Sequence, residues 1–87
     1  MGASPLGWCV YVVECRDGTL YTGVARDVER RLEQHNAGRG ARYTRGRAPV
    51  KMVAASRAME KRAAYRLEWA VKQLPRRRKA AALRSRP

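Results

Sequence analysis

The feature that most constrains this chain is a pair of short apolar runs on either side of a turn signal. Residues 8–15 and 19–25 are rich in β-branched and aromatic side chains, which favour β-strands. Between them, Arg16-Asp17-Gly18 has the composition of a tight turn. The two runs therefore predict a β-hairpin, and every later segment has to pack around it.

The length of the turn decides which side chains share a face of this hairpin. A two-residue loop would place Tyr11 and Tyr21 on opposite faces, because a one-residue change of register turns every side chain over. In a three-residue loop, Gly18 adopts the left-handed conformation that follows a type I turn. Tyr11 then lies opposite Gly23 and on the same face as Tyr21. We expect the three-residue loop, with open space over Gly23.

A helix is expected directly after the hairpin. Asp27 is a good N-cap for residues 28–36, because its side chain can accept a hydrogen bond from the first turn. Gly38 is suited to the left-handed position at which helices commonly end.

A third strand and two more helices are expected in the rest of the chain. The strand is predicted at 50–55, and a long helix at 57–74 with Ser56 as its cap. Pro75 ends that helix and can begin a short basic one. The inward stripe of the long helix should be Met59, Ala63, Leu67, Ala70 or Val71, and Leu74. The large aromatic side chains expected in the core are Trp8, Tyr65 and Trp69. The predicted fold class is α+β, a small three-stranded antiparallel sheet flanked by helices.

The charge of the chain points to a polyanionic partner. The 87 residues include 20 Lys and Arg against seven Asp and Glu, a formal net charge of +13. Self-repulsion of this size disfavours a compact fold unless a partner neutralises it, and nucleic acid is the first candidate, with DNA favoured. A basic ribosome-associated protein, or one that is merely soluble, is the alternative.

The length of the chain and its apolar runs bound the architecture. We expect one domain at 8–83, with flexible termini at 1–7 and 84–87, and a monomer rather than an obligate oligomer. The longest apolar run, 9–13, is too short to span a membrane, and no signal-peptide core lies near Met1. A cytoplasmic protein without a membrane partner is therefore expected.

The two cysteines are expected to be structural. Cys9 and Cys15 fall on one predicted strand, so they should lie roughly 20 Å apart, which is too far for a disulfide. They have no histidine partners at zinc spacing, and we expect buried, reduced thiols.

Four side chains of the hairpin and the first helix are candidates for catalysis. Tyr11 and Tyr21 share a face of the hairpin, while Arg31 and His35 lie one turn apart beside the apolar stripe of the helix. A phenol is a weak base at its ordinary pKa of about 10, and a nearby cation such as Arg31 lowers that pKa. The guanidinium fork also suits a phosphate. His35 is the only side chain that titrates near neutrality. A purely structural role is the alternative for both tyrosines and for His35.

Glu68 is the candidate metal ligand. It flanks the inward stripe of the long helix, where a solvated carboxylate is not expected. Its oxygens suit Mg²⁺, which keeps most of its waters and can be held by one carboxylate plus a substrate phosphate. An i, i+4 ion pair with Lys72 is the structural alternative, and Glu60 is a more exposed competitor.

Together these residues are typical of phosphodiester hydrolysis. That reaction needs an activated water, a cation for the charge on the equatorial oxygens, and a metal at the leaving oxygen. Tyr11, Arg31 and Glu68 can fill these roles in that order. The sequence has no Ser–His–Asp set, no glycine-rich phosphate loop that opens a helix, and no paired carboxylates for glycoside hydrolysis.

These residues and their spacing resemble the GIY-YIG nuclease superfamily over nearly the whole chain. The signature tripeptides appear as Cys9-Val10-Tyr11 and Tyr21-Thr22-Gly23, followed by the helix that carries Arg31 and His35. The later stretches GARYTRGRAPV and LEWAVK resemble small single-domain bacterial members and the nuclease subunit of structure-selective resolvases, which suggests a place in DNA repair.

The resemblance implies a divalent-metal-dependent endonuclease that cuts DNA, with a single-stranded, branched or otherwise distorted substrate expected. It also implies one Mg²⁺ or Mn²⁺ ion as cofactor. The roles implied are general base, directly or through a relay, for Tyr11, support for Tyr21 and His35, transition-state stabilisation for Arg31, and metal ligation for Glu68.

We expect the domain itself to hold the nucleic acid. The expected contacts are Arg39, Arg42, Tyr43, Arg45, Arg47, Lys72, Arg76, Arg77, Arg78 and Lys79. Tyr43 can stack on a base or pack against the domain, and both interpretations stay open. Two rival functions also stay open, namely a non-catalytic nucleic-acid-binding protein and a nuclease subunit that needs a protein partner.

Overall fold

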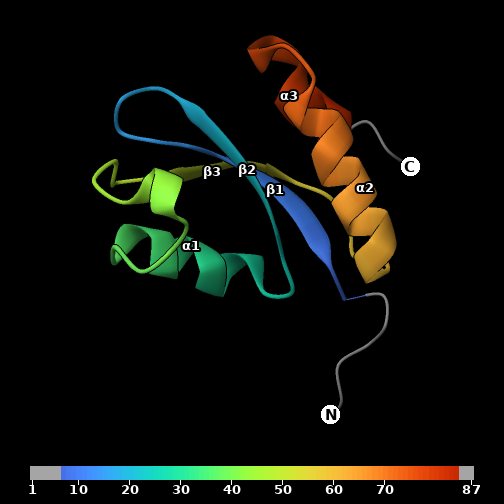
Figure 1. The fold of residues 1–87 in the computed structure, drawn as a ribbon, viewed down its shortest axis with the longest axis horizontal. Coiled ribbons are helices and arrows are strands. Elements are labelled where there is room, and N and C mark those ends of the chain that lie inside the picture. Colours follow the sequence, from blue (N-terminus) through green and yellow to red (C-terminus); the bar gives the residue numbers. More distant parts are fainter. Residues whose placement is uncertain (1–6, 85–87) are drawn as a thin grey trace.

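A three-stranded antiparallel sheet separates two layers of helix in the computed structural model, which describes residues 7–84 (Figure 1). The strands are β1 (Cys9–Glu14), β2 (Leu20–Ala25) and β3 (Lys51–Ala55). Their order in the sheet is β2-β1-β3, so β1 is central and pairs on both sides. This arrangement confirms the predicted α+β fold.

The hairpin of β1 and β2 has the predicted three-residue turn. Tyr11 pairs with Gly23 in the register of the two strands. The Cys15 N–H donates to the Thr19 carbonyl at 2.8 Å, and Gly18 has a φ of 85°, which a glycine adopts without strain. Both tyrosines of the hairpin therefore lie on one face of the sheet.

The helices divide between the two faces of the sheet. On one face lie α1 (Val28–Asn36) and the following loop, which contains the short 3₁₀ helix η1 (Arg42–Thr44) (Figure 1). On the other face lie α2 (Lys61–Lys72) and α3 (Arg76–Arg84). The helix α1 has the predicted bounds, and the Asp27 side chain caps it by accepting from the Arg30 N–H at 3.0 Å.

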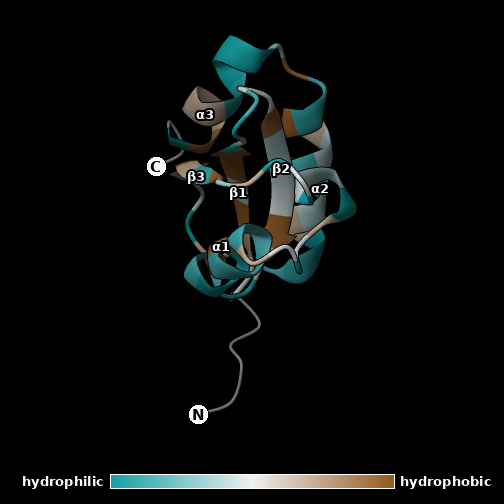
Figure 2. Cartoon of the chain, turned by 90° about the vertical axis from the view of Figure 1, so that its left-hand side faces the viewer, coloured by the Kyte–Doolittle hydropathy of each residue, from teal (hydrophilic) through white to brown (hydrophobic). Residues whose placement is uncertain are grey.

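Side chains alternate along β1 and build a core on each face. Val10 and Val12 pack against α2 and α3, in a cluster with Ala64, Val71 and Leu83. Figure 2 shows β1 in the brown of hydrophobic residues, with the ribbon of α1 mostly in the teal of hydrophilic ones.

The second cluster lies on the α1 face of the sheet. Tyr11, Val13 and Cys15 of the first strand and its end pack there with Ala25 and Val50. The two buried clusters are thus separated by the sheet itself, and a single strand contributes to both.

The long helix starts later than predicted, and Ser56 does not cap it. The chain leaving β3 still pairs with the first strand, because the Ser56 N–H donates to the Val10 carbonyl at 2.8 Å and Trp8 forms a bridge with Met59. The Ser56 hydroxyl accepts from the Val10 N–H and donates to the Arg57 carbonyl, both at 2.9 Å. These pairings hold the segment extended up to Glu60, where α2 can begin.

The inward stripe of the long helix is only partly as predicted. Val71 is buried, and Met59 and Leu67 pack against its cluster, as expected. The prediction was wrong for Ala63 and Ala70, which are exposed, while Ala64 is buried instead. Placing the large aromatics in the core was wrong for two of the three. Tyr65 and Trp69 are exposed, and only Trp8 is partly buried.

The remaining architectural predictions have mixed outcomes. Both cysteines are free as expected, with Cys15 buried and Cys9 partly exposed. Residue 84 belongs to α3, and the rest of the predicted flexible termini, 1–6 and 85–87, lies outside the described residues. Within residues 7–84, every helix is too short or too polar to cross a membrane.

Candidate active site

Tyr11 leans across the hairpin and occupies the space above Gly23. A Cβ atom built on Gly23 would lie 2.6 Å from the Tyr11 hydroxyl oxygen and 2.7 Å from the ring carbon that carries it. Only a glycine leaves room for this approach. The open space expected over Gly23 is therefore filled by the phenol, whose side chain is 1% exposed.

Three aromatic rings meet at this position, and we call them the ring cluster: Tyr11, Tyr21 and His35. The centroids of the two phenol rings are 6.3 Å apart. The imidazole of His35, at the end of α1, lies 5.8 Å from the Tyr11 ring and 5.5 Å from the Tyr21 ring. The structure thus brings three of the four predicted catalytic side chains into contact.

A chain of hydrogen bonds fixes the tautomer of His35. The Thr44 hydroxyl donates its only proton to the Ala41 carbonyl at 2.9 Å, so it must accept from His35 Nδ1–H at 2.7 Å. His35 Nε2 then carries a lone pair, and it accepts from the Tyr11 hydroxyl at 2.8 Å. The Ala41 N–H lies 3.4 Å from Nδ1, beyond the usual range of an N–H hydrogen bond, and a protonated Nδ1 has no lone pair to accept it.

Burial, more than charge, controls the pKa of Tyr11. The pKa is raised to about 12, and desolvation is the largest cause. The charges of Tyr21 and Glu68 act in the same direction, while Arg31 opposes them by hydrogen bonding and by charge. The expectation that Arg31 would lower the phenol pKa is right in direction, but burial outweighs it. Tyr11 is therefore neutral at physiological pH.

The pKa of His35 is shifted in the opposite sense. Burial lowers the pKa of the imidazole, and the positive charge of Arg31 lowers it further. His35 is accordingly neutral at pH 7, which agrees with its role as the acceptor of the Tyr11 proton in the hydrogen bond.

Arg31 lies on the rim of the ring cluster at the start of α1. Its side chain is partly buried and donates from Nη1 to Gln34 Oε1 at 3.0 Å, which fixes its orientation. Beside it is an open hollow of about 280 Å³ between β2 and α1, lined in part by Arg26, Arg30 and Arg31. Several guanidinium groups around one hollow make a site suited to a phosphate.

Glu68 lies on α2, in the other layer of helices. Its side chain is 18% exposed, and its carboxylate lies 3.4 Å from Lys72 Nζ. It is near enough to Tyr11 for its negative charge to raise the pKa of the phenol. The ion pair with Lys72 is thus present, and the carboxylate still lies beside the ring cluster.

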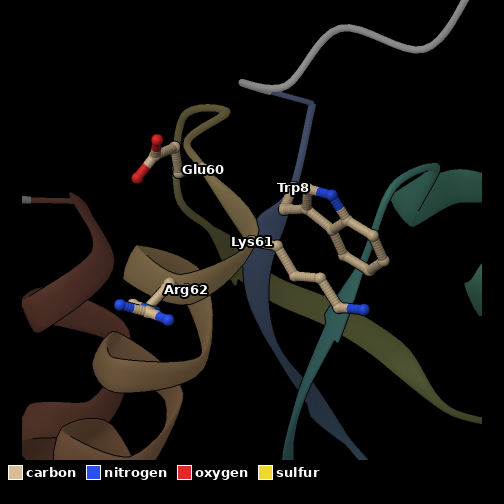
Figure 3. A pocket seen from close by; sticks show the side chains of 4 residues that line it. All are labelled: Trp8, Glu60, Lys61 and Arg62. Carbon is tan, nitrogen blue, oxygen red and sulfur yellow. The ribbon is translucent and has the colours of Figure 1, made fainter.

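The competitor Glu60 lies elsewhere. It is exposed at the start of α2, where it lines a separate pocket with Trp8, Lys61 and Arg62 (Figure 3).

The donor set near Glu68 fits a metal that needs few protein ligands. Among residues 7–84, no three His, Cys, Asp or Glu side chains lie close enough together to bind one metal ion. A single half-buried carboxylate oxygen donor matches Mg²⁺ or Mn²⁺, which keep several waters and complete their coordination with substrate phosphate. The chain offers that carboxylate, and Lys72 is the cation that a metal ion would displace from it.

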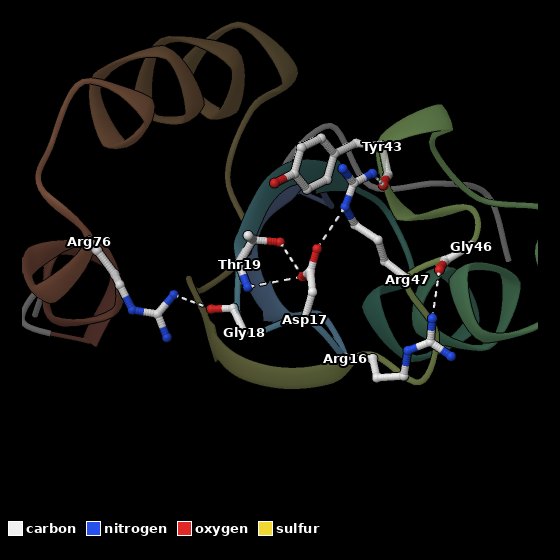
Figure 4. Close-up of polar contacts among 8 residues, drawn as sticks. All are labelled: Arg16, Asp17, Gly18, Thr19, Tyr43, Gly46, Arg47 and Arg76. Atoms are coloured by element: carbon white, nitrogen blue, oxygen red, sulfur yellow. Dashed lines mark hydrogen bonds and ion pairs between the residues drawn. The ribbon is translucent and has the colours of Figure 1, made fainter.

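Four of the basic residues predicted to contact nucleic acid are engaged within the protein, and one of them is Lys72 in its ion pair with Glu68. Arg47 donates from Nε to Asp17 Oδ2 at 3.0 Å (Figure 4). Arg76 pairs with Glu14 at 3.1 Å and also donates to the Gly18 carbonyl. These two arginines hold the hairpin turn from opposite sides.

Lys79 ties α3 to the end of α2. Its ammonium donates to the Val71 carbonyl at 3.0 Å and to the Lys72 carbonyl at 3.1 Å, both in the last turn of α2. Desolvation lowers the pKa of Lys79, and the nearby Lys72 lowers it further.

Five predicted arginine contacts remain available. Within residues 7–84, hydrogen bonds and ion pairs from their side chains are absent, and all are exposed: Arg39, Arg42, Arg45, Arg77 and Arg78. Tyr43 stacks on Tyr21 at 5.9 Å between centroids, with 21° between ring planes, and the Arg47 guanidinium lies 4.2 Å from its centroid. The packing interpretation of Tyr43 is thus supported by its contacts, and the nucleic-acid role of all ten residues stays a prediction.

Sequence reasoning missed two residues that organise the site. Thr44 is buried in η1 and orients His35, but a single threonine in an arginine-rich loop gives no signal of burial. Asn36 at the end of α1 pairs with both backbone groups of Val50, at 2.6 and 3.1 Å, and so fastens the helix to the start of the third strand. An asparagine at a helix end is the only hint that the sequence gives.

The site can be compared with known proteins. Residues 7–81 match the family of the GIY-YIG catalytic domain. A UPF0213 protein of Halobacterium salinarum is 53% identical over 72 residues, which cover 83% of this chain and 94% of that protein. A UPF0213 protein of Xanthomonas axonopodis is 45% identical over 80 residues, which cover 92% of this chain and 78% of that protein.

A solved structure is also similar. The solution NMR structure of the UPF0213 protein of Bacillus halodurans has 49% sequence identity and a TM-score of 0.50, and covers 83% of this chain and 77% of that one. The family match spans the hairpin, the ring cluster, α1 and α2 together. A domain of this kind implies nuclease-type activity and nucleic-acid binding, and its members generally use a divalent metal. The chain belongs to the GIY-YIG family.

Proposed function

We propose that this protein is a divalent-metal-dependent endonuclease that hydrolyses phosphodiester bonds in DNA, with a single-stranded, branched or distorted substrate. The observation that carries the proposal is the 2.8 Å hydrogen bond from the Tyr11 hydroxyl to a neutral His35, flanked by Arg31 and Glu68. The activity is assigned to one domain at 8–83.

Activation of water would run through Tyr11 as a relay. A phenol with a pKa of about 12 is not a phenolate at neutral pH, so it has no free negative charge with which to attract a proton. Its oxygen can accept a proton from water while its own proton passes to His35 Nε2. The imidazolium formed in this step keeps its Nδ1–H bond to Thr44. Tyr21 packs on both rings and holds them in position.

Arg31 and Glu68 supply the remaining groups. Arg31 carries a permanent positive charge at the edge of the hollow, where it can bind a phosphate and stabilise the charge that builds on its equatorial oxygens. Glu68 would hold Mg²⁺ or Mn²⁺, which when bound supplies a positive charge for the leaving oxygen.

The test is a cleavage assay with purified protein on single-stranded, duplex and branched DNA, in Mg²⁺, Mn²⁺ or EDTA. Wild type is expected to cut at least one substrate with metal and none in EDTA. Glu68→Gln is expected to bind DNA without cutting it. Glu60→Gln is the matched control, because it removes the carboxylate of the residue just before α2, at a different pocket, and it should cut like wild type.

Other outcomes would replace the proposal. Binding without cleavage under all conditions would identify a nucleic-acid-binding protein that lacks activity. Cleavage only after a second protein is added would identify a nuclease subunit. Equal cleavage by Glu68→Gln and wild type would remove Glu68 from the metal site.

A further inference from the structure

Two large aromatic side chains of α2 are exposed to solvent. Tyr65 is 46% exposed and Trp69 is 66% exposed, the largest exposure of any bulky hydrophobic residue described. They are four residues apart, so they lie one turn apart on one side of the helix. An indole left this open to water needs a reason, because burying it would stabilise the fold.

The position of the pair on the helix ties it to the candidate active site. At about 100° per residue, Tyr65 lies about 60° and Trp69 about 100° around α2 from Glu68. The buried side chains of α2, Ala64 and Val71, lie on the other side of Glu68. Around α2, Glu68 therefore lies between the buried side chains and the two aromatic rings.

Trp8, the other tryptophan of the chain, packs against neighbouring side chains and provides a comparison for Trp69. It is partly buried, and its ring centroid lies 6.3 Å from that of Tyr65. The Arg26 guanidinium and the Lys61 ammonium lie 5.1 and 5.2 Å from the Trp8 ring, and Figure 3 shows the Lys61 side chain running alongside it. For Trp69, by contrast, neither a ring nor a cation stacks on the indole anywhere in residues 7–84.

The charges around the exposed indole define the chemistry of its partner. The helix α2 carries four cations and a single acid, Glu68. The cations are Lys61, Arg62, Arg66 and Lys72. A bare aromatic face among positive charges suits a ligand with a flat π-system on an anionic backbone, which describes an unpaired base in a nucleic acid strand.

We propose that Trp69, supported by Tyr65, is a stacking platform for an unpaired nucleobase next to the phosphate that Arg31 would bind, together with a metal ion held by Glu68. This inference rests on the proposed function and locates one part of its substrate. Bases inside a duplex are stacked on each other and cannot lie flat on the indole, so the platform favours single-stranded segments. Because every base has a π-face, the platform discriminates little between sequences.

The test is a binding measurement in EDTA, where cleavage does not interfere, with a labelled single-stranded oligonucleotide and the same sequence as a duplex. Trp69→Leu keeps apolar bulk but removes the aromatic face, and it is expected to weaken single-strand binding about 5- to 100-fold. Trp69→Phe should retain most of the affinity. Duplex binding should change by less than about twofold for both variants.

The salt dependence separates stacking from charge. Trp69→Leu should leave the slope of log K against log salt unchanged, because it removes no cation. Arg66→Gln on the same helix is the matched control, and it should reduce the magnitude of the slope by about 1. Circular dichroism should show the same helix content for all variants, since both side chains are exposed.

Three outcomes would overturn the platform. In the first, wild type and Trp69→Leu bind the single strand equally well. In the second, Trp69→Leu changes the sedimentation of the free protein, which would make this face a contact between copies of the chain. In the third, wild type binds no nucleic acid, which removes the proposed function as well, whereas the first outcome removes the platform alone.

Discussion

The two faces of β1 use the same strand for opposite purposes. On the α2 side, Val10 and Val12 make an apolar cluster whose contacts are all hydrophobic packing. On the α1 side, Tyr11 lies between them in sequence but ends in a hydrogen-bonded chain through His35 and Thr44. One face is therefore packed by apolar side chains, whereas the other, which we call the chemical face, holds a buried chain of polar groups, and a two-residue period separates them.

The chemical face carries polar groups into the interior without leaving them unpaired. Among residues 7–84, no buried side-chain nitrogen or oxygen lacks a hydrogen-bond partner. Each unpaired group would cost about 1–3 kcal/mol, so the polar chain is stable only as a complete set. The comparison predicts that changes on this face affect activity first, while changes on the apolar face affect folding first.

The largest effect is expected from Tyr11→Phe. It keeps the ring above Gly23 but removes the hydroxyl that relays the proton, so DNA cleavage should fall about 10²- to 10⁴-fold. A single-turnover cleavage assay measures this, and urea unfolding of the same variant checks that it is folded. If folded Tyr11→Phe cleaves DNA within tenfold of the wild-type rate, substitutions on the α1 face do not affect activity first, and the comparison fails.

The counterpart on the apolar face is Val12→Ala. Deleting two buried methyl groups between the sheet and α2 should lower the free energy of unfolding by about 2–3 kcal/mol. Urea unfolding measures the loss. Cleavage per folded molecule at low temperature should stay within about twofold of wild type, and a loss comparable to that of Tyr11→Phe would contradict the comparison.

A matched pair of threonine variants tests whether hydrogen bonding stabilises the chemical face of β1. Thr44→Val leaves His35 Nδ1–H and the Ala41 carbonyl without their partner, which should destabilise the protein by about 1–3 kcal/mol. Thr22, also buried, pairs with Val12 in the register and donates no side-chain hydrogen bond within residues 7–84. Thr22→Val should therefore be nearly neutral, within about 0.5 kcal/mol in urea unfolding. Equal losses of unfolding free energy in the two variants would show that the hydrogen bonds of the Thr44 hydroxyl do not account for the destabilisation.

The ring cluster also predicts how stability depends on pH. The pKa of His35 is lowered in the folded state, so the unfolded chain binds the proton more readily, and stability falls as the pH drops below about 6.5. The pKa of Tyr11 is raised to about 12, so stability falls again as the pH rises from about 10 toward 12. Urea midpoints across this range measure both losses. The acid loss should shrink in His35→Gln and the alkaline loss in Tyr11→Phe, and unchanged curves would contradict the assignment.

The smallest effect is expected for exposed basic residues, whose removal should change mainly the salt dependence of DNA binding. Arg42→Ala removes an exposed cation without an internal partner, so it should lower the magnitude of the salt slope of DNA binding by about 1. Arg76→Ala should change that slope less, because Arg76 is paired with Glu14, and should lower the urea midpoint slightly. Binding titrations at several salt concentrations measure both, and equal slope changes would show that pairing does not limit contact with DNA.

The parts of the fold that could be predicted from the sequence depend on local signals. Gly18 fixed the turn length and hence the face shared by the tyrosines, and Asp27 fixed the start of α1. The start of α2 was missed, because Ser56 is held by a strand 46 residues earlier in the chain and a local capping pattern carries no trace of that pairing.

The site itself was predictable in its members but not in its energetics. The residue types and spacing brought together Tyr11, Tyr21 and His35 on one face, as their contacts bear out. The pKa of Tyr11 moves opposite to the expected direction because its burial is a product of packing, which the sequence alone does not quantify. The exposure of Trp69 was missed for a similar reason, since an aromatic residue at helical spacing is typical of a core.

The ring of Tyr11 above Gly23 has one more consequence, which concerns the assembly of the hairpin. If β1 slid by two residues against β2, the phenol would meet a residue with a Cβ at the place that glycine leaves bare, and the ring could not settle there. Tyr11 thereby helps to select the correct alignment of its own strands. A molecule that has paired them wrongly cannot also form the ring cluster, so the strand register and the cluster arise in a single event.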